Sequence, residues 1–230
     1  MLIGKILNKT FGHVYVKNLS ESMERRRLIE ESFDKVGLTY SIEKAYDGLK
    51  FVGQQFNFQH GPFHITYPAS AGFFGGQLST IRILMDEIEK QSPSCIMCDD
   101  DSFVRDVSCL NYNLTNTISS NLPPNWNIII LGGLAYDGKL DNTTEFSYRK
   151  CTHGSQAAGS HAVAINRKTY SSLFEKNIRF QFWGDGCIDQ LIQEGANVYM
   201  ITPSLIFQDR NSISTINKIK STDYLIPRNV

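Results

Sequence analysis

The sequence predicts an α/β fold built around a mostly parallel central sheet flanked by helices. The first observation is a strand–helix–strand unit, in which residues 13–19 and 39–45 have strand character and residues 23–36 have helical character. This order favours two parallel strands joined by a right-handed crossover. The second observation is a pair of short apolar runs, at residues 94–98 and 126–131, of the kind found in strands buried on both faces.

The individual elements follow from periodicity and turn residues. The helix at 23–36 carries Leu28, Ile29 and Phe33 at helical spacing, and Gly37 ends it. Residues 49–72 show little periodicity and are expected to form a long functional loop or a short hairpin. The later elements are expected in the order helix 77–90, strand 94–98, weakly periodic helix 107–119, strand 126–131, irregular segment 134–155, strand 159–166, helix 167–176, helix 187–194 and strand 197–201.

Length and charge exclude several classes of protein. The 230 residues are enough for one domain, in which residues 210–230 form a packed tail or a linker. The 23 basic and 23 acidic residues leave a net charge of zero, so no nucleic-acid partner is expected. No run approaches the roughly 20 apolar residues of a membrane span. The start of the chain also lacks the apolar core of a signal peptide, so a cytoplasmic protein is expected.

Three consecutive aspartates, Asp99, Asp100 and Asp101, follow the apolar run at 94–98. In open α/β sheets, ligands bind beyond the carboxyl ends of the strands. Adjacent carboxylates repel one another, and a divalent cation relieves that repulsion; oxygen ligands favour Mn²⁺ or Mg²⁺ over zinc. Alternation along an extended segment would turn Asp99 and Asp101 toward one metal and Asp100 away from it, toward hydroxyl groups of a donor. A solvated acidic turn or a helix cap is the structural alternative.

Other motifs narrow the chemistry. No P-loop signature and no G-x-S-x-G elbow is present, which argues against a P-loop kinase and an α/β-hydrolase. Cys95 and Cys98 form a C-x-x-C that could be a redox pair or half of a zinc site, although buried, reduced thiols are the simpler interpretation.

Five parts of the sequence are informative when taken in order: Val14 to Leu19 with Arg25 to Arg27, Ala45 to Gly48, Gly72 to Ser79, Cys95 to Val104 and Gly159 to Asn166. Together they resemble glycosyltransferase family 25, which contains lipooligosaccharide and procollagen galactosyltransferase-like enzymes. The resemblance runs in order from about residue 13 to residue 208. Ser79-Thr80 stands where the family has a Ser-His pair, and Cys98 stands where it has Glu, so the chain would be a distant relative with its own sugar specificity.

The resemblance implies a GT-A fold, with a nucleotide-sugar-binding half at about 1–105 and an acceptor half at about 106–209. It implies inverting transfer from a nucleotide sugar, a UDP-sugar being favoured, to a hydroxyl of a glycan or glycoprotein acceptor. A bound Mn²⁺ or Mg²⁺ would offset the charge on the departing diphosphate. Two alternatives remain: a metal-dependent phosphohydrolase or nucleotidyltransferase, and a non-catalytic module that binds sugar nucleotides.

The remaining roles have named candidates. Asp185, in a Trp-Gly-Asp segment that resembles a motif of several GT-A enzymes, is the candidate base, although it could simply cap the following helix; Asp189 is the alternative base. Trp183 could stack on a sugar face. His153 or His161 could supply a third metal ligand, although a lone histidine is more often structural. The candidates for donor binding are Val16, Lys17, Asn18, Arg25, Asp100 and Trp183, with Gln208 and Asp209 as further contacts to metal or phosphate.

Overall fold

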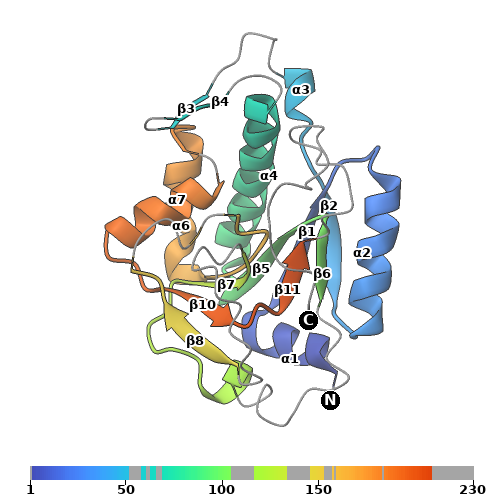
Figure 1. Ribbon diagram of the computed structural model, residues 1–230, viewed down its shortest axis with the longest axis vertical. Coiled ribbons are helices and arrows are strands. Elements are labelled where there is room, and N and C mark those ends of the chain that lie inside the picture. Colours follow the sequence, from blue (N-terminus) through green and yellow to red (C-terminus); the bar gives the residue numbers. More distant parts are fainter. Residues whose placement is uncertain are drawn as a thin grey trace.

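A seven-stranded sheet forms the centre of the molecule, with helices on both of its faces (Figure 1). The computed structural model describes residues 2–51, 58–60, 63–65, 69–104, 117–133, 146–152, 157, 159–182 and 184–208. The strands of the sheet, in spatial order, are β2 (Tyr40–Lys44), β1 (His13–Asn18), β5 (Ser94–Asp99), β9 (Ala162–Asn166), β7 (Ile128–Gly132), β10 (Val198–Thr202) and β8 (Ser147–Lys150). The helices are α1 (Ile3–Phe11), α2 (Met23–Lys35), α3 (Gly48–Phe51), α4 (Ala69–Lys90), α6 (Arg167–Ile178) and α7 (Gly184–Gln193).

The sheet is mixed. Strand β1 is parallel to both β2 and β5, and β10 is parallel to β7. Strand β9 lies between β5 and β7 and is antiparallel to both, and β8 is antiparallel to β10. The predicted α/β class is confirmed, and the expected parallel order holds for β2–β1–β5 and for β7–β10. Strand β9 departs from the expected parallel order. A short apolar run shows neither the direction of a strand nor its neighbours in the sheet.

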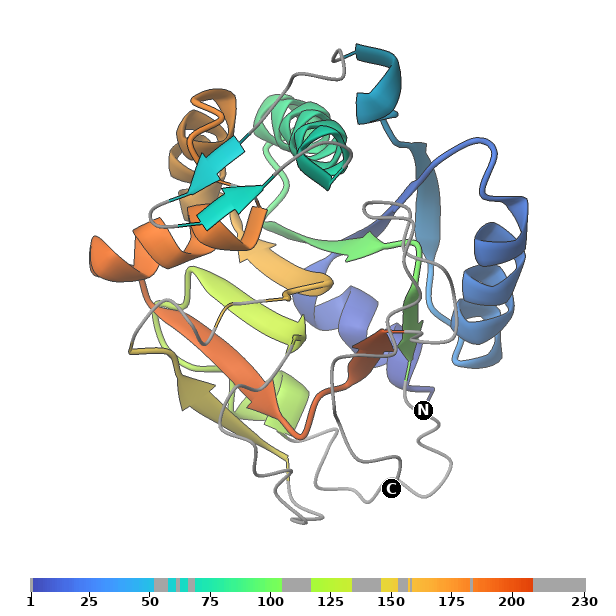
Figure 2. The same cartoon turned by 45° about the horizontal axis from the view of Figure 1, so that its top comes forward.

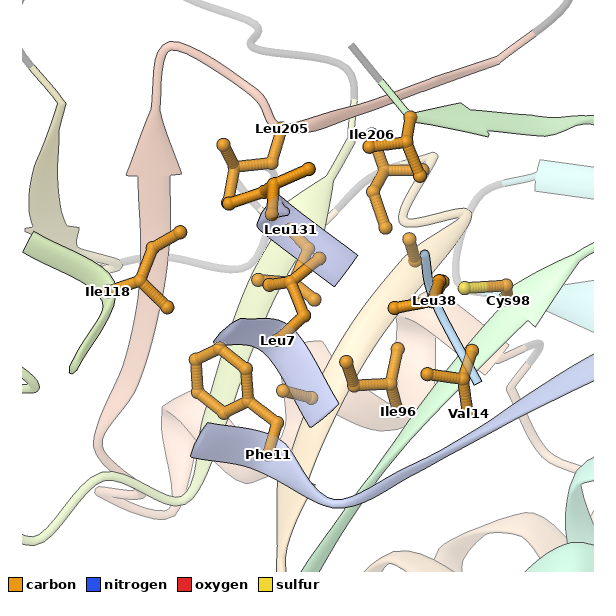
Figure 3. Packing of buried hydrophobic residues seen from close by; sticks show 14 of the residues in the cluster. Leu7, Phe11, Val14, Leu38, Ile96, Cys98, Ile118, Leu131, Leu205 and Ile206 are labelled. Atoms are coloured by element: carbon orange, nitrogen blue, oxygen red, sulfur yellow. The ribbon is translucent and has the colours of Figure 1, made fainter. Parts of the chain in front are cut away.

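Alternation along the strands divides the core into two clusters, one on each face of the sheet. Val14 and Ile96 face a cluster that also contains Leu7 and Phe11 of α1 and Phe33 of α2 (Figure 3). The intervening strand residues face the second cluster, which is formed with α4, α6 and α7. Figure 2 shows these three helices together above the sheet. The strand residues of the second cluster include Tyr15, Cys95, Met97, Ile128, Ile130, Val163, Ile165, Val198 and Met200.

Two small β-ribbons complete the described fold. One pairs β6 (Ser102–Val104) with β11 (Ile206–Gln208), and the other pairs β3 (Phe58–His60) with β4 (Phe63–Ile65); both are antiparallel. The first ribbon matters for the site because its register sets Gln208 opposite Ser102, directly after the acidic run. The second is the hairpin that was one of two expectations for residues 49–72.

Most predicted elements lie where they were expected. The strands at 13–19, 39–45, 94–98 and 126–131 and the helix at 23–36 are confirmed within about two residues. Helix α1, strand β8 and the β6–β11 ribbon were not predicted. Most of the predicted helix at 107–119 and all of residues 210–230 lie outside the described residues. In the described part of the chain, no helix combines the length and apolar character needed to cross a membrane.

Helix α4 packs very closely against the turn between β2 and α3. A Cβ on Gly75 would lie 2.3 Å from the carbonyl oxygen of Tyr46 and 2.6 Å from the backbone nitrogen of Gly48. The amide of Tyr46 donates to the hydroxyl of Ser79, which in turn donates to the carbonyl of Gly75. The glycine and the serine together hold the end of β2 against the middle of α4.

We expect Gly75→Ala to lower the free energy of unfolding by about 1–3 kcal/mol, because the added methyl group overpacks this contact. The neighbouring variant Gly76→Ala is the control, since its Cβ would meet no described atom within 4 Å. Helix propensity alone should make that control more stable by about 0.5–1 kcal/mol. Thermal unfolding followed by circular dichroism measures both, and equal midpoints for the two variants would contradict the close approach.

Candidate active site

The order in which strands are added to the sheet reverses between β1 and β5. From β1 the chain passes through α2 to β2 on one side, and it later enters β5 on the other side of β1. Ligands of open α/β sheets bind outside the carboxyl ends of the strands at such a switch point. Lys17 and Asn18 end β1 here, and Asp99 ends β5.

Lys17 and Asp99 form an ion pair across the two strands. They are register partners, and the Lys17 Nζ lies 2.8 Å from Asp99 Oδ1. Their neighbours Tyr15 and Met97 belong to the α4-side core, so alternation places this pair on the α4 face of the sheet. Burial disfavours the charged lysine, but the attraction and hydrogen bond to Asp99 outweigh it and raise the pKa of Lys17. The side chain of Asp99 is 43% exposed and is therefore available to a ligand.

Asp100 is held on the opposite face of the sheet. Its Oδ2 accepts a hydrogen bond of 2.8 Å from Asn18 Nδ2, and its Oδ1 lies 2.6 Å from Arg25 Nη1 of helix α2. Burial raises the pKa of Asp100, while Arg25 and Asn18 act in the opposite direction. Both carboxylate oxygens have protein partners, so this side chain ties α2 to the end of β5.

Asp101 completes the run in a turn, where strand alternation has ended. Its Oδ2 accepts a 3.1 Å hydrogen bond from Gln208 Nε2 and lies 3.5 Å from Arg25 Nη2. Its Oδ1 is buried and has no hydrogen-bond partner among the described residues. Burial, with the nearby charge of Asp99 second, raises the pKa of Asp101 to about 7. One carboxylate oxygen therefore remains for a ligand that carries positive charge.

A cavity connects these charged groups with helix α4. One end is formed by the acidic run, Lys17, Arg25 and Gln208, and the other by the β2–α3 turn and α4. Its lining residues are Lys17, Leu19, Arg25, Ala45, Tyr46, Asp47, Gly48, Leu49, Gly72, Gly76, Ser79, Asp99, Asp100, Asp101 and Gln208.

The chemistry of these oxygens fits Mg²⁺ or Mn²⁺. Both are hard cations that take oxygen ligands, and Mg²⁺ is commonly bound by one or two carboxylates together with substrate phosphates. Asp101 offers its unpartnered buried Oδ1, and Asp99 offers a half-exposed carboxylate. Among the residues that the structure describes, no group of three His, Cys, Asp or Glu side chains is arranged to hold a metal by itself. The two aspartates would thus need ligands from phosphate or water.

Two further carboxylates lie on helix α7, which packs on the same face of the sheet as Lys17 and Asp99. Asp185 Oδ2 accepts a 2.7 Å hydrogen bond from the Gly159 amide, and its Oδ1 accepts one of 3.0 Å from the Gly186 amide. Burial raises the pKa of Asp185, with a smaller contribution from the charge of Asp99. Asp189 lies one turn further; burial and then the charge of Asp185 raise its pKa to about 7.

The other residues predicted for the site are either buried in the core or outside the described part of the chain. The side chain of Val16 is fully buried in the core, which leaves only its backbone for a ligand. The ring of His161 is buried, with Nε2 3.0 Å from the carbonyl oxygen of Ile206. Trp183, His153 and Asp209 lie outside the described residues. Cys95 and Cys98 are buried thiols in clusters on opposite faces of the sheet, so they do not form a shared redox or metal site.

Sequence reasoning missed the role of Gln77. This residue is buried on α4, where its Nε2 donates to the carbonyl oxygen of Phe182 and lies 3.8 Å from Cys187 Sγ. It therefore fixes the turn that leads into α7 and Asp185. The available signal was a glutamine two turns before Leu84, on the helix face that packs into the core.

No protein-family model matches the chain, and no curated protein sequence matches it. Among solved structures, it is similar to A197 from STIV, with a TM-score of 0.46 and 11% identity over 95% of this chain and 97% of the other. It is similar to a glycosyltransferase involved in glycosylation of the major capsid of PBCV-1, with a TM-score of 0.46 and 11% identity over 87% of this chain and 94% of the other. It is also similar to mouse xyloside xylosyltransferase 1, with a TM-score of 0.34 and 14% identity over 80% of this chain and 69% of the other. These likenesses are distant, and the resemblance to family 25 stays a prediction.

We expect Arg25→Leu to lower the free energy of unfolding by about 3–5 kcal/mol, because it leaves Asp100 buried without its cationic partner. The matched control is Arg26→Leu at the next position of the same helix, which removes an exposed ion pair with Glu30. That control should cost no more than about 1 kcal/mol. Urea unfolding at pH 7 measures both, and similar losses for the two variants would show that Arg25 is not a buried tie.

Asp189→Asn should change how stability depends on pH. The folded-state pKa of Asp189 is about 7, above its ordinary value of 3.8, so the folded protein binds the extra proton between these two values. Stability from this group is therefore present at low pH and is lost as the pH rises through 7. Asparagine imitates the protonated form, so the variant should unfold at a higher temperature than the wild type at pH 8 and at a similar one at pH 4. A constant difference across this range would contradict the shifted pKa.

Proposed function

We propose that this chain is a GT-A-type glycosyltransferase that moves a sugar from a nucleoside diphosphate sugar to an acceptor hydroxyl. The observation that carries the proposal is the group formed by Lys17, Asp99 and Asp101 at the carboxyl ends of β1 and β5, where they line one cavity. A donor diphosphate is strongly anionic, and this site offers a lysine and carboxylates suited to a divalent cation. The resemblance of the sequence to family 25 supports the same function.

The donor would be held by groups that already have defined positions. Asp99 and Asp101 would hold a Mn²⁺ or Mg²⁺ ion, which when bound offsets the negative charge on the diphosphate leaving group. Lys17 lies beside Asp99 and can turn its ammonium toward a phosphate oxygen at the cost of that ion pair. Arg25 and Asn18 keep Asp100 on the other face of the sheet, so they serve the site by fixing the loop after β5.

Asp185 is the proposed general base. In an inverting transfer the base takes the proton of the acceptor hydroxyl while the oxygen attacks the anomeric carbon. The bond from that carbon to the phosphate oxygen breaks, and its electron pair leaves with the diphosphate. The amides of Gly159 and Gly186 orient the Asp185 carboxylate, and its raised pKa makes it a stronger base than an exposed aspartate.

The test is incubation of the protein with UDP- and GDP-sugars, a panel of glycan acceptors and Mn²⁺, with the products identified by mass spectrometry. Formation of a nucleoside diphosphate together with a lengthened acceptor is the expected result. Release of inorganic phosphate would instead indicate the phosphohydrolase alternative. Binding of the donor without any turnover would indicate a sugar-nucleotide-binding module.

In this assay we expect Asp185→Asn to lower kcat by about 10²–10⁴-fold, the usual contribution of a general base. The KM for the donor should change little. The unfolding temperature should fall somewhat, because the asparagine oxygen can accept from only one of the two amides, Gly159 and Gly186, that the carboxylate accepts from. Asp189→Asn is measured in parallel. A larger loss of kcat in that variant would move the role of base to Asp189, and an unchanged kcat in both would exclude a base on α7.

A further inference from the structure

Helix α4 presents glycines to the cavity in its interior. Gly72 and Gly76 are four residues apart, so they lie on one face of this 22-residue helix, and both line the cavity. Glycine destabilises the interior of a helix because it leaves the unfolded backbone freer and fills no space. A helix that keeps glycine in its middle therefore needs a reason for it.

Packing within the protein supplies such a reason for Gly75 but not for Gly76. At Gly75 the carbonyl of Tyr46 and the backbone of Gly48 occupy the space that a side chain would need. At Gly76 an added Cβ would meet no described atom within 4 Å, and its backbone is ordinary helix without a positive φ. Glycine is also the residue used where a ligand approaches the backbone closely. Gly76 meets this condition, since it is exposed and lines the cavity, so that a ligand there can approach its backbone.

The two ends of the cavity differ in charge. The strand-end side carries Asp99, Asp101 and Lys17, and the unpartnered buried Oδ1 of Asp101 lines this side as an acceptor for a cation. The α4 side is formed by the β2–α3 turn, Ala45 to Leu49, with the two glycines and Ser79. No lysine or arginine lines that side among the described residues. Its one charged lining residue in the described part of the chain is Asp47, so this side suits a neutral group that donates hydrogen bonds better than a phosphate.

The order of the strands indicates which part of the donor lies on the α4 side of the cavity. Asp185 binds the amide of Gly159, which leads into β9, and β9 lies on the far side of β5 from β1 and β2. The transferred sugar must lie between the base and the diphosphate, so it points toward β9. The nucleoside is at the opposite end of the donor, and the diphosphate separates it from the sugar. The nucleoside is thus directed toward β2 and α4.

We propose that Gly72 and Gly76 form the wall of α4 against which the nucleoside of the donor packs, and that the missing side chain at position 76 determines which donors fit. This inference rests on the proposed function and adds to it a specificity-determining residue outside the charged group. Gly75, one residue earlier, holds the opposite wall at a fixed distance through its contact with Tyr46 and Gly48.

The experiment measures binding of UDP and of inorganic pyrophosphate, each with Mn²⁺, by calorimetry to the wild type, Gly76→Ala and Gly76→Leu. We expect Gly76→Leu to raise the Kd of UDP at least about tenfold, a factor that corresponds to about 1.4 kcal/mol. Its Kd for pyrophosphate should stay within about twofold. Gly76→Ala should weaken UDP less and raise the unfolding temperature by about 1–4 °C. Glu89→Leu, which adds the same side chain at an exposed position of α4, is the control and should leave both constants unchanged.

The outcomes separate this inference from the proposed function. Unchanged UDP binding in Gly76→Leu, with a wild type that binds UDP, would overturn the role of Gly76 and leave the glycosyltransferase proposal standing. Equal losses of UDP and pyrophosphate binding would also overturn it, because the wall would then contact the phosphates. A wild type that binds none of UDP, GDP, CDP and ADP would overturn both. If Gly76→Leu is poorly folded, the stabilised Gly76→Ala variant decides by the direction of its UDP affinity.

Discussion

The buried contact of Arg25 with Asp100 and Asp101 is the interaction on which the site depends. A carboxylate in a protein interior needs a compensating charge or several hydrogen-bond donors. Arg25 supplies the charge from α2, and Asn18 supplies a donor from the end of β1. The same guanidinium therefore fixes the distance from α2 to the loop after β5. Three carboxyl groups stand against two cationic groups, Lys17 and Arg25, and this excess of acidic groups favours a cation at the strand ends.

The remaining elements hold this loop from other directions. Strand β11 pairs with β6, and its Gln208 reaches Asp101 from a position more than one hundred residues later in the chain. On the other face, the contact of Gly75 with the β2–α3 turn fixes α4, and Gln77 fixes the turn before α7. Three unrelated parts of the sequence thus converge on the ends of β1 and β5. Loss of any one of these ties would displace a wall of the cavity while leaving the two core clusters in place.

The sequence predicts those strands and helices that have a clear local periodicity. The strands at 13–18 and 94–99 and the helix at 23–35 show the periodicity of their class, and the acidic run was placed at a strand end from its apolar neighbours alone. Helix α1 has such a pattern in Ile3, Ile6 and Leu7, but the polar residues Lys5, Asn8 and Lys9 between and after them make the segment look like an irregular N-terminus. Strands β6 and β11 are three residues long, too short for any period to show.

The partners within the site were harder to predict, because they depend on tertiary structure. Arg25, Arg26 and Arg27 are identical as residue types, and only the position of α2 decides that Arg25 reaches the aspartates while the other two pair with glutamates on the helix surface. Alternation was a reliable guide as far as Asp99 but not beyond, because β5 ends there and Asp101 lies in a turn. The spacing of Gly72 and Gly76 is visible in the sequence, but it does not show what lies beside them. The significance of Gly76 appears only when the space beside it is seen to be open.

The charged side chains at the ends of β1 and β5 are distributed over the two faces of the sheet. Alternation sends Lys17 and Asp99 to the face covered by α4 and α7, and sends Asn18 to the face covered by α2. The buried, fully partnered carboxylate of Asp100 therefore lies on the α2 face. The half-exposed Asp99 lies on the same face as Gly76 and Asp185. A ligand at the strand ends would nevertheless meet both sets of groups, because Arg25 and Asp100 line the cavity together with Lys17, Asp99 and Gly76. A change at Arg25 or Asp100 should then act first through stability, because it leaves a buried charge without its partner, while a change at Gly76 should act through binding.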